Sequence, residues 1–158
     1  MDEDNYKDAY RSYNQRRCVF EKAINARRCR CELSKRFNLA DREGVTCLDD
    51  TGNQYCKEIL GLLRQNASFA LQMTKVPGPL PHAKEMKVQV GGMLGMQKLL
   101  QPGLAGNEDV HNIDGLNRLA LEKYGRLENL PFTEIVQTIV SFKGRQRKRD
   151  RDRDKPRR

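Results

Sequence analysis

The feature that most constrains the fold is a regular apolar spacing through residues 55–75, YCKEILGLLRQNASFALQMTK. Apolar residues recur there at three- and four-residue steps, which places them on one face of an α-helix. They are Ile59, Leu62, Leu63, Phe69, Ala70 and Met73. The following segment, VPGPLP at residues 76–81, holds three prolines, and proline is not accommodated inside a helix. The pattern therefore predicts one amphipathic helix that ends before residue 76.

Similar but looser periodicity predicts further helices. They cover residues 5–25, 92–100 and 108–124, and a last one begins near Pro131. Residues 27–52 end in the turn-rich LDDTGNQ, and residues 83–91 fit either a short strand or a helix. We therefore expect a mainly α fold: one compact domain of about five helices over residues 1–144, with a cysteine-bearing loop region.

The charge is concentrated at the C-terminus. The chain has 158 residues and a net charge of +9, and the last fourteen, RQRKRDRDRDKPRR, hold nine Lys or Arg and three Asp. This tail, residues 145–158, has no apolar face, so we expect it to be disordered. Clustered cations favour phosphate backbones, although interposed aspartates and the lack of aromatic residues weaken that interpretation. An acidic protein partner or a solubilising role is the alternative.

No targeting or spanning segment is visible. The N-terminus, MDEDNYKDAYRSYNQRR, has no apolar core of a secretory signal. No run approaches the ~18 apolar residues of a spanning helix. We expect a cytoplasmic chain without a membrane partner, in a compartment where structural disulfides are uncommon.

All five cysteines fall between residues 18 and 56, with the spacing C-x10-C-x-C-x15-C-x8-C. Four thiolates can close a tetrahedral metal shell or hold an iron–sulfur cluster. The candidate ligands are Cys29, Cys31, Cys47 and Cys56, with Cys18 as an alternate. Cys29 and Cys31 would point in nearly opposite directions on a helix, so a shared site requires a non-helical segment. Buried core thiols and redox-reactive thiols are the two other interpretations.

The spacing favours an iron–sulfur cluster over zinc. Structural zinc sites usually contain repeated C-x2-C or C-x4-C pairs, often with histidine. Here there is no C-x2-C, and no histidine precedes His82. Arginines near the first cysteines, among them Arg27, Arg28, Arg30 and Arg36, offer positive charge to a thiolate-ligated cluster. Zinc is the alternative metal.

The segments CVFEKA…RRCRC…REGVTC…C, LPHAKEMKVQVGG and LPFTEIVQTIVSF resemble a group of small uncharacterised proteobacterial proteins. The resemblance covers roughly residues 17–142 and brings no activity or site with it. It implies only that these segments belong to one domain.

We therefore expect a small metal-binding protein, with an iron–sulfur cluster in electron transfer, redox sensing or a structural role. The alternative is a nucleic-acid-associated or adaptor protein, with structural zinc or no metal, that acts through its basic tail. An unidentified protein partner is expected in either case. No acid–base pair or nucleophile stands out, so an enzyme is the least supported class.

Overall fold

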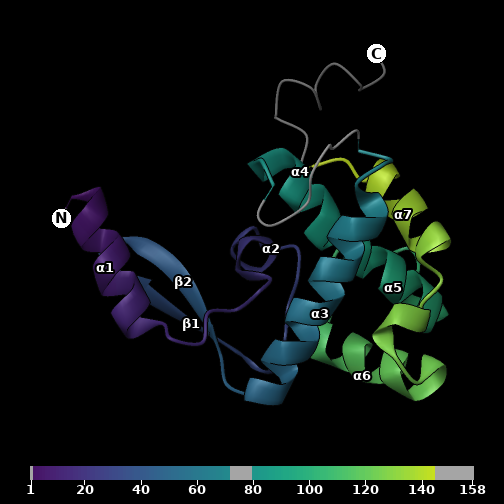
Figure 1. Ribbon diagram of the computed structural model, residues 1–158, viewed down its shortest axis with the longest axis horizontal. Coiled ribbons are helices and arrows are strands. Elements are labelled where there is room, and N and C mark those ends of the chain that lie inside the picture. Colours follow the sequence, from purple (N-terminus) through teal and green to yellow (C-terminus); the bar gives the residue numbers. More distant parts are fainter. Residues whose placement is uncertain (1, 72–79, 145–158) are drawn as a thin grey trace, which may run out of the picture.

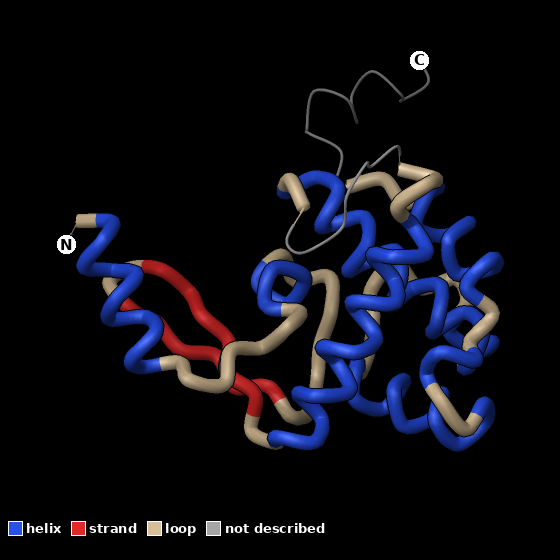
Figure 2. Tube along the Cα trace, in the orientation of Figure 1, coloured by secondary structure: helices blue, strands red, loops and turns tan. Residues whose placement is uncertain are grey.

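The structure, a computed structural model, describes residues 2–71 and 80–144, and its fold is mainly helical, as predicted (Figures 1 and 2). The predicted basic tail, residues 145–158, lies outside the described residues. The helices are α1 (Glu3–Tyr13), α2 (Glu21–Asn25), α3 (Asp50–Ala67), α4 (His82–Met86), α5 (Gly92–Leu100), α6 (Ile113–Tyr124) and α7 (Phe132–Ser141). The strands are β1 (Ser34–Leu39) and β2 (Arg42–Cys47). Among these helices, none is long and apolar enough to cross a membrane.

The helical body is built from α3, α5, α6 and α7, and the hairpin and α1 extend to one side of it (Figure 1). Its core consists of fully buried aliphatic side chains from all four helices. They include Ile59, Leu63, Met93, Met96, Leu116, Ile135 and Ile139. The three- and four-residue spacing in the sequence places these side chains on the inner faces.

Residues 82–100 form one continuous helical run, which settles the open assignment of residues 83–91. A π-helical stretch, Lys87–Gly91, joins α4 to α5. Glycines let this run approach α7 closely. A Cβ added to Gly91 would lie 2.8 Å from the Ile139 Cα, and one on Gly95 would lie 3.2 Å from the Ile135 Cα.

A buried ion pair connects this run to α3. The Glu85 carboxylate, only 1% exposed, pairs with the Arg64 guanidinium. It also accepts a hydrogen bond from Gln89 Nε2 at 2.8 Å and one from the Leu80 amide at 3.3 Å. These three partners satisfy a charge that would otherwise be costly to bury.

The predicted helix over residues 5–25 is wrong in its middle. Helix α1 ends at Tyr13 and α2 begins at Glu21, because the intervening segment pairs with β2. The amide of Cys18 donates to the Val45 carbonyl at 2.9 Å. Pairing of this segment with β2 therefore prevents the continuous helix that the loosely spaced apolar residues predict.

The β1–β2 hairpin was not predicted. Its two-residue turn is Ala40–Asp41, with φ of 49° and 68°, as a tight hairpin turn of the primed type requires. Neither residue is the Asn or Gly that marks such turns in sequence. The Phe37 ring covers Gly44 and contacts α1 through Tyr13, with ring centroids 4.7 Å apart.

Candidate metal centre

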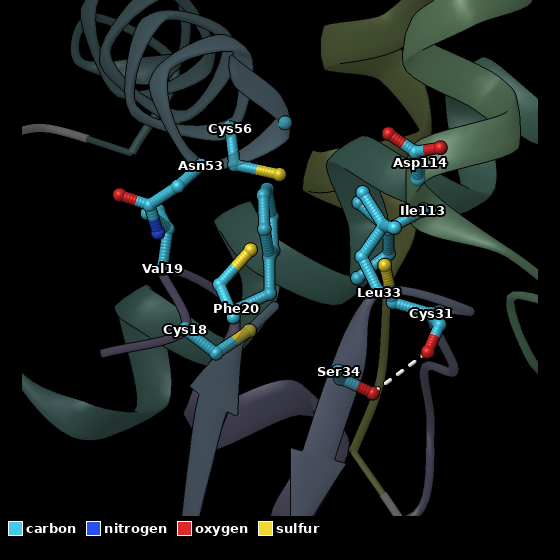
Figure 3. Close-up of a pocket in the computed structure, with 12 residues that line it drawn as sticks. Cys18, Val19, Phe20, Cys31, Leu33, Ser34, Asn53, Cys56, Ile113 and Asp114 are labelled. Carbon is cyan, nitrogen blue, oxygen red and sulfur yellow. Dashed lines mark hydrogen bonds between the residues drawn. The ribbon is translucent and has the colours of Figure 1, made fainter. Parts of the chain in front are cut away.

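Four of the five cysteines line one pocket: Cys18, Cys31, Cys47 and Cys56. Figure 3 labels Cys18, Cys31 and Cys56 among its lining residues. Each comes from a different segment of the chain. All five are free thiols in this structure.

Cys18 and Cys47 are placed by strand pairing. Residues 16–18 run antiparallel to the end of β2: the Cys18 amide donates to Val45 and the Cys47 amide donates to Arg16 at 2.8 Å. Side chains alternate between the two faces along each paired strand. Cys18 lies opposite Val45, and Val45 precedes Cys47 by two residues. Both thiols therefore lie on the same face of the pairing.

Cys31 is brought to the pocket by a different contact. The segment before it runs beside residues 110–113: the Arg30 amide donates to the Val110 carbonyl at 3.0 Å, and the Ile113 amide donates to the Arg30 carbonyl at 2.9 Å. A turn follows, closed by Ser34 Oγ, which donates to the Cys31 carbonyl at 2.7 Å. These bonds hold Cys31 at the N-terminus of α6, next to Ile113 (Figure 3).

Cys56 enters from α3, on the side of the pocket opposite Cys31 (Figure 3). Helix α3 begins earlier than the predicted residue 55, because Asp49 caps it and accepts the Gly52 amide at 2.7 Å. Gly52 itself lines the pocket, and a Cβ there would lie 2.7 Å from Leu33 Cδ1.

Cys29 lies outside the pocket. It pairs with Val110 in an isolated parallel bridge, and its side chain is 1% exposed in the core. Burial raises the pKa of its thiol well above the ordinary range. Cys29 therefore lies apart from the pocket, whereas Cys18, the alternate in the sequence prediction, lines it with Cys31, Cys47 and Cys56.

Backbone N–H groups partly offset the rise in pKa that burial causes at two of the four thiols: that of Phe20 acts on Cys18, and those of Leu33 and Asp114 act on Cys31. The Nδ2 of Asn117 donates to the Cys56 sulfur at 3.4 Å. Such donors stabilise a thiolate or a metal-bound sulfur. The fourth sulfur, of Cys47, instead donates to the Asp49 carbonyl at 3.2 Å.

Two helix N-termini also face the pocket. Gly52 and Asn53 of α3 line one side, and Ile113 and Asp114 of α6 line another. The partial positive charge at the start of a helix favours negative charge nearby. The Asp114 carboxylate is held by Arg118 at 2.9 Å.

Burial nevertheless opposes ionisation of these thiols. It raises the pKa of Cys18 to about 12 and raises the pKa of Cys31 and Cys56 as well. The charge of each neighbouring thiolate raises these pKa values further. Four thiolates together therefore need a compensating cation, which a bound metal supplies.

The arginines near the first cysteines are engaged elsewhere. Arg27 pairs with Glu43 at 2.8 Å, and Arg28 pairs with Asp109 at 3.2 Å. Arg36 donates to the Ile24 carbonyl at 2.7 Å. Neither these three nor Arg30 is among the residues that line the pocket.

The thiols surround a small space. Its volume is about 10 Å³, room for about one water molecule. Within residues 2–71 and 80–144, no three His, Cys, Asp or Glu side chains stand close enough to share a metal ion. A tetrahedral zinc with Zn–S bonds of about 2.3 Å needs sulfurs about 3.8 Å apart. Loading with zinc would therefore draw the four sulfurs closer together.

Comparisons with known proteins add no relative. No protein-family model, curated protein or solved structure matches the chain. The resemblance to small proteobacterial proteins stays a prediction.

Sequence reasoning missed Asn117 and the N-terminus of α6. Asn117 lies 61 residues after the thiol it contacts. Cysteine spacing carries no signal for a donor that only tertiary packing brings near.

Proposed function

We propose that this chain is a small metal-binding protein whose four thiols, Cys18, Cys31, Cys47 and Cys56, hold an iron–sulfur cluster. The observation that carries the proposal is the meeting of these four cysteines, from four separate segments, at one pocket. Thiolates are the usual ligands of such clusters, and four is the usual number.

The surroundings of the thiols support a bound metal over four simple core residues. A core thiol needs no donor aimed at its sulfur, yet Asn117 donates to the Cys56 sulfur, and backbone N–H groups partly offset the rise in the pKa of Cys18 and Cys31 that burial causes. Cys29 shows the contrast, because it is buried in the core and lies apart from the pocket.

An iron–sulfur cluster is favoured over zinc by the ligand set. The four ligands carry no histidine and no short cysteine pair, which are typical of structural zinc sites. When bound, a cluster supplies one-electron chemistry or a structural link. The chain's residues supply thiolates, N–H donors and an apolar wall that includes Val19, Phe20 and Ile113.

Metal analysis combined with an absorption spectrum of anaerobically purified protein tests the proposal. We expect iron and acid-labile sulfide, with a broad thiolate-to-iron band in the visible region. Zinc at about one ion per chain would replace the cluster with a structural zinc site. Protein without metal after anaerobic purification and reconstitution would refute metal binding.

The basic tail supports a second role as a nucleic-acid-associated or adaptor protein. The sequence observation is the nine Lys or Arg in residues 145–158. Deleting these residues should abolish salt-sensitive RNA or DNA binding by the full chain. Full affinity after the deletion would contradict a role for the tail.

A further inference from the structure

The two edges of the β1–β2 hairpin differ in how their backbone groups are satisfied. On the outer edge of β2, the Val45 carbonyl accepts the Cys18 amide at 2.9 Å, and the Val45 amide donates to the Glu21 carboxylate at 2.8 Å. The Cys47 amide donates to the Arg16 carbonyl at 2.8 Å. Other parts of the chain therefore cover this edge.

The same bonds show which residues of β1 face the opposite edge of the hairpin. In an antiparallel pair, hydrogen-bonded pairs of residues alternate with pairs whose backbone groups both point away from the partner strand. Val45 and Cys47 point away from β1, and the register places them opposite Arg36 and Ser34. Arg36 and, two residues further on, Asn38 therefore direct their backbone groups outward from β1.

This outer edge of β1 is open beyond its first residue. The Ser34 amide donates to the Cys31 carbonyl at 3.1 Å. Within residues 2–71 and 80–144, the backbone N–H and C=O groups of Arg36 and Asn38 have no hydrogen-bond partner. Both residues are exposed, and the hairpin extends from the helical body (Figure 1). A row of free N–H and C=O groups is a template on which another strand can pair.

The side chains of β1 determine which kind of strand can pair there. The strand, SKRFNL, holds two cations and no acidic residue. Lys35 and Arg36 are both exposed, and they lie on opposite faces of the hairpin because side chains alternate along a strand. Among the described residues, neither forms an ion pair with a carboxylate. Like charges on adjacent strands repel, so this edge disfavours a second copy of β1 and favours an acidic strand.

We infer that the outer edge of β1 binds an extended acidic segment of a protein partner as an additional β-strand. The backbone groups of Arg36 and Asn38 supply the main-chain hydrogen bonds, and the charges of Lys35 and Arg36 select carboxylate side chains. None of these three residues lines the cysteine pocket. The inference therefore does not depend on a bound metal.

Amide hydrogen exchange of the full chain, followed by NMR, tests this inference with a synthetic peptide of alternating glutamate and threonine. We expect the Arg36 and Asn38 amides to exchange severalfold more slowly when the peptide is in excess, because they become hydrogen-bonded. A peptide with lysine in place of glutamate should give no protection. Absence of protection by the glutamate peptide, or equal protection by the lysine peptide, would overturn the inference.

Two variants separate the backbone contribution from the charge. Asn38→Pro removes an outward N–H but no bond within the hairpin, since proline is accepted on edge strands where the N–H faces solvent. It should abolish protection of the Arg36 amide. Lys35→Glu should weaken peptide affinity severalfold, whereas Lys57→Glu, the same charge change at an exposed position of α3, should leave it unchanged.

Circular dichroism establishes that each variant is folded, and Lys35→Glu decides the test if Asn38→Pro is not. Wild-type affinity in a folded Asn38→Pro or Lys35→Glu variant would overturn the inference. A concentration-dependent dimer that protects the Arg36 and Asn38 amides without peptide would also overturn it, because the edge would then belong to a second copy of the chain.

Discussion

Cys18 and Cys47 lie on paired segments whose hydrogen bonds fix both residues by the backbone alone. The Cys18 amide donates to Val45 at 2.9 Å, and the Cys47 amide donates to Arg16 at 2.8 Å. This ladder places two thiols on one face before any side-chain packing is considered. The other two thiols reach the pocket only because α3 and α6 dock beside the ladder.

Serine substitutions should separate ligands from core thiols. Changing any one of Cys18, Cys31, Cys47 or Cys56 to Ser should lower iron per chain severalfold, since a hydroxyl is a poor ligand for iron in a cluster. The measurement is iron and sulfide content after anaerobic reconstitution.

Cys29→Ala is the matched control for those variants. It should keep the iron content of the wild type and lose about 1 kcal/mol of stability, because Cys29 is buried in the core. Iron loss in Cys29→Ala equal to that of the other variants would return Cys29 to the ligand set.

Two helical glycines should respond to alanine in opposite directions. Gly61 has nothing within 4 Å of an added Cβ, so Gly61→Ala should stabilise the fold by about 1 kcal/mol. At Gly91 the added Cβ meets the backbone of Ile139, so Gly91→Ala should destabilise by about 1–3 kcal/mol. Urea unfolding of both variants measures the difference, and equal effects would contradict the close contact with α7.

Breaking the buried ion pair should lower the free energy of unfolding substantially. Arg64→Ala leaves the Glu85 carboxylate, 1% exposed, without its cation, and we expect a loss of about 3–5 kcal/mol. Glu85→Gln removes the charge and should cost less. A smaller loss in Arg64→Ala than in Glu85→Gln would contradict this account of the pair.

The same pair predicts how stability depends on pH. Burial raises the pKa of Glu85, but hydrogen bonds from Arg64 and Gln89 and the charge of Arg64 outweigh it, so the net pKa lies below the ordinary value. The carboxylate therefore contributes stability that is fully present above its unfolded pKa of about 4.3 and is lost as the pH falls through its folded value. In Glu85→Gln, unfolding free energy measured between neutral and acidic pH should fall less steeply than in the wild type.

Removing the cap of α3 should affect stability and metal retention together. Asp49→Ala deletes the acceptor of the Gly52 amide and should cost about 1 kcal/mol. Because α3 carries Cys56, this variant should also lose its metal faster to a chelator. Asp49→Asn is the control, since asparagine caps about as well; equal effects in both variants would mean that the carboxylate charge matters more than the cap.

The helices of the body were predictable because their apolar spacing is strong and local. The hairpin was not, since its turn is Ala40–Asp41 and lacks the Asn-Gly or Asp-Gly pair that usually signals one. The break after Tyr13 was also hidden, because it depends on pairing of Cys18 with Val45, far along the chain.

That the candidate site consists of cysteines was predictable, but which four of the five line the pocket was not. Clustering of five thiols within 39 residues is visible in the sequence. The position of Cys29 in the core is set by its bridge to Val110. The two residues are separated in the sequence by more than half of the chain's length, so no local sequence pattern predicts their contact.

The separation of 61 positions between Cys56 and Asn117 also has a consequence for biogenesis. Synthesis proceeds from the N-terminus, so every cysteine leaves the ribosome before α6 exists. In a chain that holds the proposed cluster, iron captured early would be bound by thiols that still lack the donor of Asn117. The centre would then be complete only when the C-terminal half folds onto it, so the direction of translation would order the two events in time.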